Sequence, residues 1–377
     1  MLSNASFPKR PAEKVTPFEV MAIVRRASAQ PDAVRFEVGE PDLPPPPGVR
    51  EALKNLPAKA YGYTPSAGLW ALREKIARWY ETEQNLSIDP ARIFVTPGSS
   101  AALLSAYWLV LGPQDRVVMA DPSYPCYHNF ARLQGIEARV VPTRAEEGYM
   151  ISPDALCADD RAVHILSPAN PTGGVYAPSA LKALAKRCRA LDVALISDEL
   201  YQGLWYEQKP PSALAFDENA LVTNGFSKTF CMPGFRLGWI VVPERLIETM
   251  ERLAQNLYLC APTPMQYAAL EAFDSAYLEE VRLTFKARRE WLVSRLARFF
   301  DLPCKPQGAF YVWCDVSPYY DDSGAFCRDL WEKEKVSVTP GGDFGPGGRR
   351  FVRFAFTREI AVMEEGIRRL ARFLSNL

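Results

Sequence analysis

Polar and charged side chains follow several short apolar runs of the 377-residue sequence, at points where strands of a sheet would end. Asn170, Asp198 and Lys228 each come within four residues of the end of such a run, and Arg236 comes eight residues after Lys228. Taken singly, an acid at a strand end is typical of a helix cap, and a lysine there of a solvated side chain. Together they are an amine that can act as a nucleophile, an acid that can pair with a buried positive group, and a cation for an anionic ligand.

A second candidate is the segment Thr96-Pro97-Gly98-Ser99-Ser100, which joins an apolar run to a helical pattern beginning near Ala101. Free backbone amides and two hydroxyls at a helix start bind anions such as phosphate. An ordinary N-cap gives the same pattern, because serine is a favoured capping residue. The segment lacks the lysine of a P-loop and the three glycines of a dinucleotide-binding fingerprint.

These residues depend on a sheet to bring them together. Between positions 92 and 243, short apolar runs alternate with helical segments, a pattern typical of buried parallel strands linked by helices. The runs are 93–96, 117–120, 138–141, 163–166, 193–196, 221–224 and 238–242. We therefore predict an α/β fold with a mostly parallel seven-stranded sheet flanked by helices, in which the loops after the strands meet in one crevice.

The sequence changes character near position 276, where a long charged helical pattern begins. Beyond it, strand-like runs and helices follow one another in an order that suggests an α+β arrangement. We expect a large domain over residues 44–275 and a small domain formed by residues 1–43 and 276–377. The glycine-rich loop 341–348 is not followed by a helical pattern, so we interpret it as an ordinary loop rather than a nucleotide-binding one.

Composition excludes several classes of function. Lysine plus arginine equals aspartate plus glutamate at 44 each, which argues against a nucleic-acid-binding protein. We find neither a signal-peptide pattern nor a membrane-spanning apolar stretch and expect a cytoplasmic protein that does not bind membranes. The two histidines, His128 and His164, lie far apart, so we expect no metal site and no serine–histidine–aspartate triad.

The candidate residues suit one kind of cofactor. An amine, a carboxylate and a set of phosphate donors in one crevice are what pyridoxal 5'-phosphate requires, because its aldehyde condenses with an amine and its ring nitrogen must stay protonated. Lysine then also takes over the proton transfers for which histidine is often used.

The sequence resembles the fold type I pyridoxal-phosphate enzymes, specifically the class I/II aminotransferases of the aspartate aminotransferase superfamily. The resemblance extends from about position 34 to the C-terminus. Its motifs are Gly39-Glu40-Pro41-Asp42, Tyr61-Gly62-Tyr63, Asp121-Pro122-Ser123-Tyr124, Asn170-Pro171-Thr172-Gly173, Ser197-Asp198-Glu199-Leu200-Tyr201, Ser227-Lys228, Gly234-Phe235-Arg236-Leu237-Gly238 and Phe351-Val352-Arg353-Phe354.

The resemblance implies a role for each matching residue. Lys228 would be the Schiff-base lysine and proton shuttle, Asp198 the partner of the ring nitrogen, and Tyr201 and Asn170 the donors to the phenolic oxygen. Residues implied for the rest of the site are Tyr124 stacked on the ring, Ser99, Ser100, Ser227 and Arg236 around the phosphate, Tyr61 reaching the phosphate of the neighbouring subunit, and Arg353 with Gly39 and Asn170 at the substrate. The family is dimeric, so we expect a homodimer with shared active sites.

The function implied is transfer of an amino group between an L-amino acid and a 2-oxo acid by a ping-pong mechanism. Two alternatives stay open at this point. One is a carbon–sulfur β-lyase reaction on the same scaffold, since it would use the same lysine, aspartate and arginine. The other is a non-catalytic regulatory protein that binds pyridoxal phosphate.

Overall fold

The computed structural model describes residues 11–377, and its largest unit is a seven-stranded sheet in the order β2-β8-β7-β6-β5-β3-β4. Its strands are β2 (Ile93–Thr96), β3 (Arg116–Asp121), β4 (Glu137–Pro142), β5 (Ala162–Leu166), β6 (Ala194–Asp198), β7 (Leu221–Gly225) and β8 (Gly238–Val241). Strand β8 is antiparallel to both of its neighbours, whereas the other paired strands run parallel. The mostly parallel seven-stranded sheet expected from the sequence is confirmed.

Two hydrophobic cores cover the two faces of this sheet. Because side chains alternate along a strand, Leu195 of β6 and Trp239 of β8 enter one core, while Ile196 and Ile240 enter the other. Helices α3 (Trp70–Gln84), α6 (Pro178–Leu191) and α8 (Thr263–Ala269) contribute to the first core, and α4 (Ser99–Val110), α5 (Cys126–Gln134) and α7 (Ile247–Leu257) to the second. Burial on both faces explains why these strands read as continuous apolar runs.

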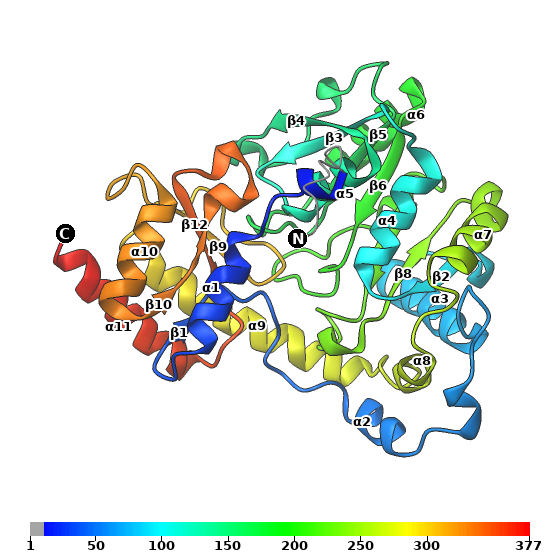
Figure 1. Ribbon diagram of the computed structural model, residues 1–377, viewed down its shortest axis with the longest axis horizontal. Coiled ribbons are helices and arrows are strands. Elements are labelled where there is room, and N and C mark those ends of the chain that lie inside the picture. The colour runs from blue at the N-terminus through cyan, green and yellow to red at the C-terminus, as the bar shows by residue number, and fades with distance from the viewer. Residues whose placement is uncertain (1–10) are drawn as a thin grey trace, which may run out of the picture.

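The remaining strands form two small sheets beside the large one (Figure 1). Strands β11 (Thr339–Pro340), β12 (Phe351–Ala355) and β9 (Tyr311–Asp315) make an antiparallel sheet, and β1 (Val34–Arg35) pairs in parallel with β10 (Val336–Ser337). Residues 336–340 thus form two short strands with different partners. Helices α9 (Ser275–Leu296), α10 (Ser323–Glu334) and α11 (Ile360–Ser375) pack here around a third core.

The segment with α1 and β1 meets the C-terminal part of the chain in this region. Helix α1 (Glu19–Ser28) contacts β11, and β1 lies against α11 (Figure 1). Helix α2 (Pro47–Lys54) lies apart from them and packs on α8. Contact between the N-terminal segment and the C-terminal region is the arrangement on which the expected domain division depends, and the division itself stays a prediction.

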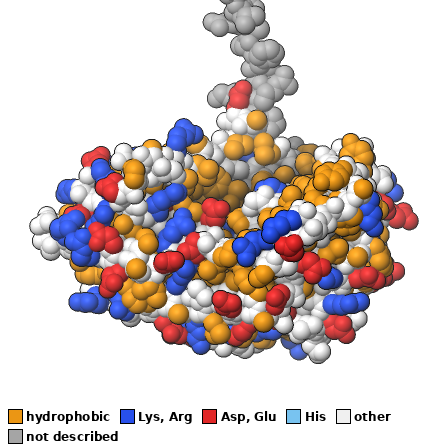
Figure 2. All heavy atoms as spheres, turned by 90° about the horizontal axis from the view of Figure 1, so that it is seen from below, with side chains coloured by type: hydrophobic (Ala, Val, Ile, Leu, Met, Phe, Trp, Pro, Cys, Tyr) orange, Lys and Arg blue, Asp and Glu red, His pale blue; other side chains and the backbone are white. Residues whose placement is uncertain are grey.

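On the face drawn in Figure 2, basic and acidic side chains are interspersed rather than gathered in one patch of either sign. Within residues 11–377, no helix is long and apolar enough to cross a membrane. The same residues contain no group of three or more histidine, cysteine, aspartate and glutamate side chains placed to hold a metal ion.

Candidate active site

Strand ends bring the candidate residues into one cavity. Asn170 follows β5, Asp198 ends β6 and Lys228 follows β7, so parallel strands deliver all three to the same edge of the sheet. Arg236 lies just before β8 instead of after a strand, and it reaches the same edge because β8 runs in the opposite direction. The cavity has a volume of ≈350 Å³. Its lining includes Gly39, Ser99, Ser100, Tyr124, Asn170, Asp198, Tyr201, Ser227, Lys228, Arg236 and Arg353.

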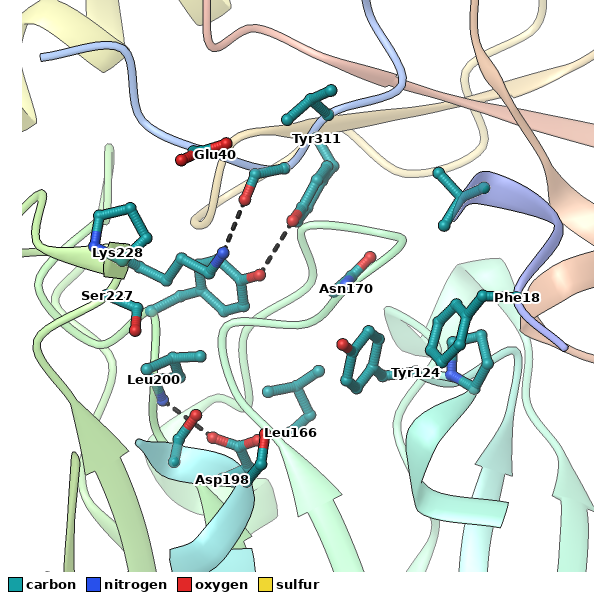
Figure 3. A pocket seen from close by; sticks show the side chains of 18 of the residues that line it. Phe18, Glu40, Tyr124, Leu166, Asn170, Asp198, Leu200, Ser227, Lys228 and Tyr311 are labelled. Carbon is teal, nitrogen blue, oxygen red and sulfur yellow. Dashed lines mark hydrogen bonds between the residues drawn. The ribbon is translucent and has the colours of Figure 1, made fainter. Parts of the chain in front are cut away.

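The amine of Lys228 points across the cavity toward the segment that carries Glu40 (Figure 3). Its Nζ donates a hydrogen bond of 2.6 Å to the backbone carbonyl of Gly39. Burial lowers the pKa of Lys228 to about 8, and the positive charge of Arg353 adds to this effect. A larger share of this amine is therefore neutral near pH 7 than of an ordinary lysine, and a neutral amine can act as a nucleophile or base.

Asp198 lies at the bottom of the cavity, with only 3% of its surface exposed. One carboxylate oxygen accepts a hydrogen bond of 2.8 Å from the hydroxyl of Tyr127, and the other accepts one of 3.1 Å from the amide of Leu200. Burial raises the pKa of Asp198 to about 6, and these two bonds oppose the rise. The group is consequently a buried carboxylate that is ionised at neutral pH and faces a space suited to a cationic ring nitrogen.

Tyr127 is a site residue that sequence reasoning missed. It lies in the first turn of α5, three residues after Tyr124, which precedes the helix, and the two rings lie 5.4 Å apart. Its position close to Tyr124 in the sequence was the available signal. Behind it, the ring of His164 lies 4.0 Å from that of Tyr127 and shares a hydrogen bond of 2.8 Å with the hydroxyl of Tyr107. Burial lowers the pKa of His164 to about 3, so this histidine stays neutral and supports the wall behind the aspartate.

An anion-binding cradle forms where β2 turns into α4. Gly98 has a φ of 80°, which favours glycine, and a Cβ placed on it would lie 2.5 Å from Nη2 of Arg236 and would push the guanidinium from its present position. Ser99 and Ser100 begin α4 and contribute hydroxyls beside the free amides of the helix start. Ser227 adds a third hydroxyl to the lining. Arginine, hydroxyls and a helix N-terminus together fit a phosphate dianion.

Arg353 lies on β12 and is 95% buried, with 5% of its surface exposed. Its Nη1 donates to Oδ1 of Asn170 at 2.8 Å, and its Nη2 donates to the carbonyl of Glu37 at 2.8 Å and to the hydroxyl of Thr339 at 3.1 Å. Of five N–H donors, those on Nε and one on Nη1 have no acceptor among the described residues. A buried guanidinium with two donors left over is suited to a carboxylate ligand. The bond from Arg353 also leaves the amide nitrogen of Asn170 free to donate into the cavity.

Two tyrosines complete the walls. The hydroxyls of Tyr201 and Tyr311 share a hydrogen bond of 2.9 Å (Figure 3), and burial raises the pKa of Tyr201 well above its ordinary value. Tyr124 stands on the opposite side, where the ring of Phe18 lies 5.9 Å from it. Tyr311 carried no motif of its own and was missed by sequence reasoning.

Tyr61 is the one predicted site residue that lies outside the cavity of its own chain. Its side chain is 79% exposed, and it does not belong to the cavity lining. The sequence assigned it to the site of a neighbouring subunit, and that assignment stays a prediction. The peptide bonds before Pro122, Pro168 and Pro171 are cis.

The donors and acceptors of this cavity fit the cofactor expected from the sequence. The cradle at α4 offers donors to a phosphate, the carboxylate of Asp198 can pair with a protonated ring nitrogen, and Lys228 offers an amine to an aldehyde. The buried Nε of Arg353, which has no partner among the described residues, leaves a further donor for a carboxylate-bearing substrate.

Comparisons with known proteins agree with this chemistry. The family model of aminotransferase class I and II matches residues 31–370. The chain is 36% identical to a valine–pyruvate aminotransferase of Mycobacterium tuberculosis, over 96% of this chain and 97% of that protein. It is 31% identical to an aspartate aminotransferase of Bacillus subtilis, again over 96% and 97%. A crystal structure of an aminotransferase from Mycobacterium tuberculosis superposes with a TM-score of 0.94 at 34% identity, covering 99% of this chain and 100% of that one.

Proposed function

The chain belongs to the class I and II aminotransferases and is a pyridoxal-phosphate-dependent enzyme of that family, and we propose that Lys228 and Asp198 carry its chemistry while Arg353 holds the substrate. The enzyme moves an amino group between an amino acid and a 2-oxo acid. The observation that carries the proposal is that Lys228, with a pKa lowered to about 8, and Asp198, with a pKa of about 6, line the same cavity.

When bound, pyridoxal phosphate supplies an aldehyde that takes up the amino group and a ring that withdraws electrons from the substrate's α-carbon. Lys228 provides the amine that holds the cofactor before the substrate arrives. Once free of the cofactor, the neutral amine of Lys228 would take the proton from the substrate's α-carbon and would then give it to the carbon that was the cofactor's aldehyde carbon. Its lowered pKa supports both roles, since the amine must be neutral to accept a proton.

Asp198 keeps the ring nitrogen protonated. A carboxylate that is ionised at neutral pH holds the adjacent proton in place, because the ion pair raises the pKa of the cationic partner. Tyr127 and the amide of Leu200 fix both carboxylate oxygens, so the side chain is oriented before the cofactor binds. Tyr201 and the free amide nitrogen of Asn170 are proposed as donors to the phenolic oxygen.

The remaining residues bind and orient. Gly98, Ser99, Ser100, Ser227 and Arg236 hold the phosphate. Arg353 pairs with the α-carboxylate that donor and acceptor share, so one site serves both half-reactions and the mechanism is ping-pong. Gly39 and Asn170 border the same space, and a Cβ on Gly39 would collide with Tyr311, which supports a need for close approach there.

We also propose a homodimer in which Tyr61 reaches the neighbouring site. Support comes from the exposure of two neighbouring aromatic side chains, Tyr61 at 79% and Tyr63 at 83%, which is unusual for a surface that contacts only water. A phosphate contact from a second chain would add a donor to the cradle at α4.

The assignment is tested by Lys228→Ala. The purified variant should give no covalent adduct with pyridoxal phosphate on borohydride reduction, as read by mass spectrometry of the peptide around position 228, and should lose nearly all turnover. Lys54→Ala, at a lysine whose side chain is 72% exposed, is the matched control and should keep the covalent adduct at position 228 and normal turnover. An adduct at another lysine, or full activity of Lys228→Ala, would contradict the assignment. Pyruvate released from a cysteine conjugate without any amino acceptor would indicate a β-lyase instead.

A further inference from the structure

The positive charges that line the cavity are all assigned by the proposed function. Among residues 11–377, the lining contains three cationic side chains, Lys228, Arg236 and Arg353. Lys228 supplies the amine, Arg236 lies against the phosphate cradle at Gly98, and Arg353 faces the α-carboxylate. Within this chain, a second carboxylate on the substrate's side chain would find no cation left to pair with it, and an unpaired buried charge is strongly unfavourable.

The wall beside Arg353 is apolar. Phe18, Val20, Met21 and Val24 line the cavity from α1 and the residue before it, and the ring of Phe344 lies 5.0 Å from the Arg353 guanidinium. Figure 3 shows Phe18 next to Tyr124 at the side of the cavity away from Lys228. Met21 is 59% exposed, so apolar surface in the cavity is left for a ligand to cover.

The first turn of α1 is held in place from the other end of the chain. The carboxylate of Asp343 accepts hydrogen bonds from the amides of Val20 at 3.0 Å and Glu19 at 3.3 Å. On the other side, Thr16 donates from its amide to Asn129 on α5 at 3.1 Å. The apolar wall therefore has a fixed position, and Asp343 is already engaged, so it is not a free partner for a cationic substrate side chain.

From these observations we propose that the site takes amino acids with neutral, apolar side chains. Phe18, Met21 and Val24 contact the substrate's side chain from one side, and Phe344 contacts it from the other. The proposal rests on the function argued above, in which Arg353 holds the α-carboxylate. Since both half-reactions use one site, we expect the oxo-acid acceptor to follow the same preference. Branched aliphatic and aromatic amino acids should be substrates, and aspartate and glutamate should be poor ones.

The test uses the dimeric holoenzyme and single-turnover half-reactions with valine, leucine, phenylalanine, aspartate, glutamate and lysine. We expect kcat/KM for the best apolar amino acid to exceed that for aspartate or glutamate by at least about 100-fold, the order that one mismatched polar or apolar contact gives. In the second half-reaction, pyruvate or a branched oxo acid should take up the amino group faster than 2-oxoglutarate. A second readout is equilibrium binding of unreactive acids, in which 4-methylpentanoate should bind more tightly than glutarate.

Met21→Arg places a cation on the exposed part of the wall. It should lower the preference for leucine over glutamate by tenfold or more, chiefly through KM, and should reverse the binding order of the two unreactive acids. Met21→Leu keeps the wall apolar and should leave the preference within about threefold. Val362→Arg adds the same charge at a 42%-exposed position on α11, outside the cavity lining, and should change nothing.

The outcomes separate this proposal from the proposed function. Rapid half-reaction with aspartate or glutamate would overturn the apolar specificity and leave the aminotransferase assignment intact. A preference for lysine would also overturn the apolar specificity, because the exposed carboxylate of Glu40 would then pair with the substrate's side-chain amine. Absence of any half-reaction with any amino acid would instead remove the proposed function. If Met21→Arg unfolds, the wild-type selectivity and the order of binding of the two acids decide the question alone.

Discussion

The fraction of Lys228 whose amine is neutral can be measured in the protein before any cofactor is added. Its pKa of about 8 means that about 20% of the amine is unprotonated at pH 7.4, against about 0.1% for an ordinary lysine with a pKa near 10.4. At that pH the fraction of reactive amine should therefore be about 200-fold larger at Lys228 than at a solvated lysine. Competitive labelling of the cofactor-free protein with acetic anhydride over pH 6–11, read peptide by peptide by mass spectrometry, gives the midpoint for each lysine.

The cause of the shift is tested by Arg353→Gln. Burial is the larger contribution and the charge of Arg353 the next, so removing that charge should raise the midpoint of Lys228 while leaving it below 10.4. Arg350→Gln is the matched control, because Arg350 is exposed, pairs with Asp321 and does not line the cavity. This variant should leave the midpoint where it is in the wild type.

Two results would refute this reasoning. A wild-type midpoint within half a pH unit of 10.4 would mean that burial does not depress the pKa of Lys228. An unchanged midpoint in Arg353→Gln, with normal thermal stability, would mean that the two cations do not interact. In the first case the protein alone would not lower the pKa of the Lys228 amine, and the amine would become nucleophilic only when the cofactor is bound.

Two further predictions concern the other parts of the site. Tyr127→Phe removes a hydrogen bond that stabilises the carboxylate of Asp198, so the pKa of Asp198 should rise further above about 6. The pH below which the cofactor-free protein stops taking up pyridoxal phosphate should therefore move upward. An unchanged pH limit would contradict the role of this bond. If Tyr61 acts across the dimer, mixing Lys228→Ala with Tyr61→Ala should restore about a quarter of wild-type activity, because half of the dimers would be mixed and each would contain one intact site. No restoration, with exchange of subunits verified by native mass spectrometry, would place Tyr61 in its own chain's site or in none.

Hydrophobic patterning predicted the large sheet because its strands are buried on both faces. Strand β6 shows both the strength and the limit of this signal: the apolar run ends at Ile196, whereas the strand continues to Asp198 because a buried acid also occupies a strand position. Helix α3 went unpredicted. It begins after Leu69 with no side-chain cap, so the usual start signal is absent, although Leu72, Ile76 and Trp79 have helical spacing.

Within the site, the residues proposed to bind the cofactor could be predicted from their positions after strands. The residues proposed to bind the substrate could not. Asn170, Asp198 and Lys228 belong to one continuous αβ region, and the rule that loops after parallel strands share an edge is enough to bring them together. Arg236 reached the same edge for a reason that the sequence did not show, namely the reversed direction of β8.

The substrate half is built from segments near the two ends of the chain, and this explains what was missed. Arg353 bonds to the carbonyl of Glu37, 316 residues away, and Asp343 bonds to the amide of Val20, 323 residues away. No local periodicity reports such contacts, so Arg353 was assigned by resemblance alone and the wall around Phe18 was not assigned at all. The lysine, the carboxylate and the phosphate cradle lie at one edge of a sheet that is buried on both faces. The side-chain wall is a helix held at its first turn by hydrogen bonds to backbone amides, and these bonds do not involve the side chains at positions 18, 21 and 24. Substitutions there should therefore alter which amino acid reacts without altering how Lys228 or Asp198 titrates.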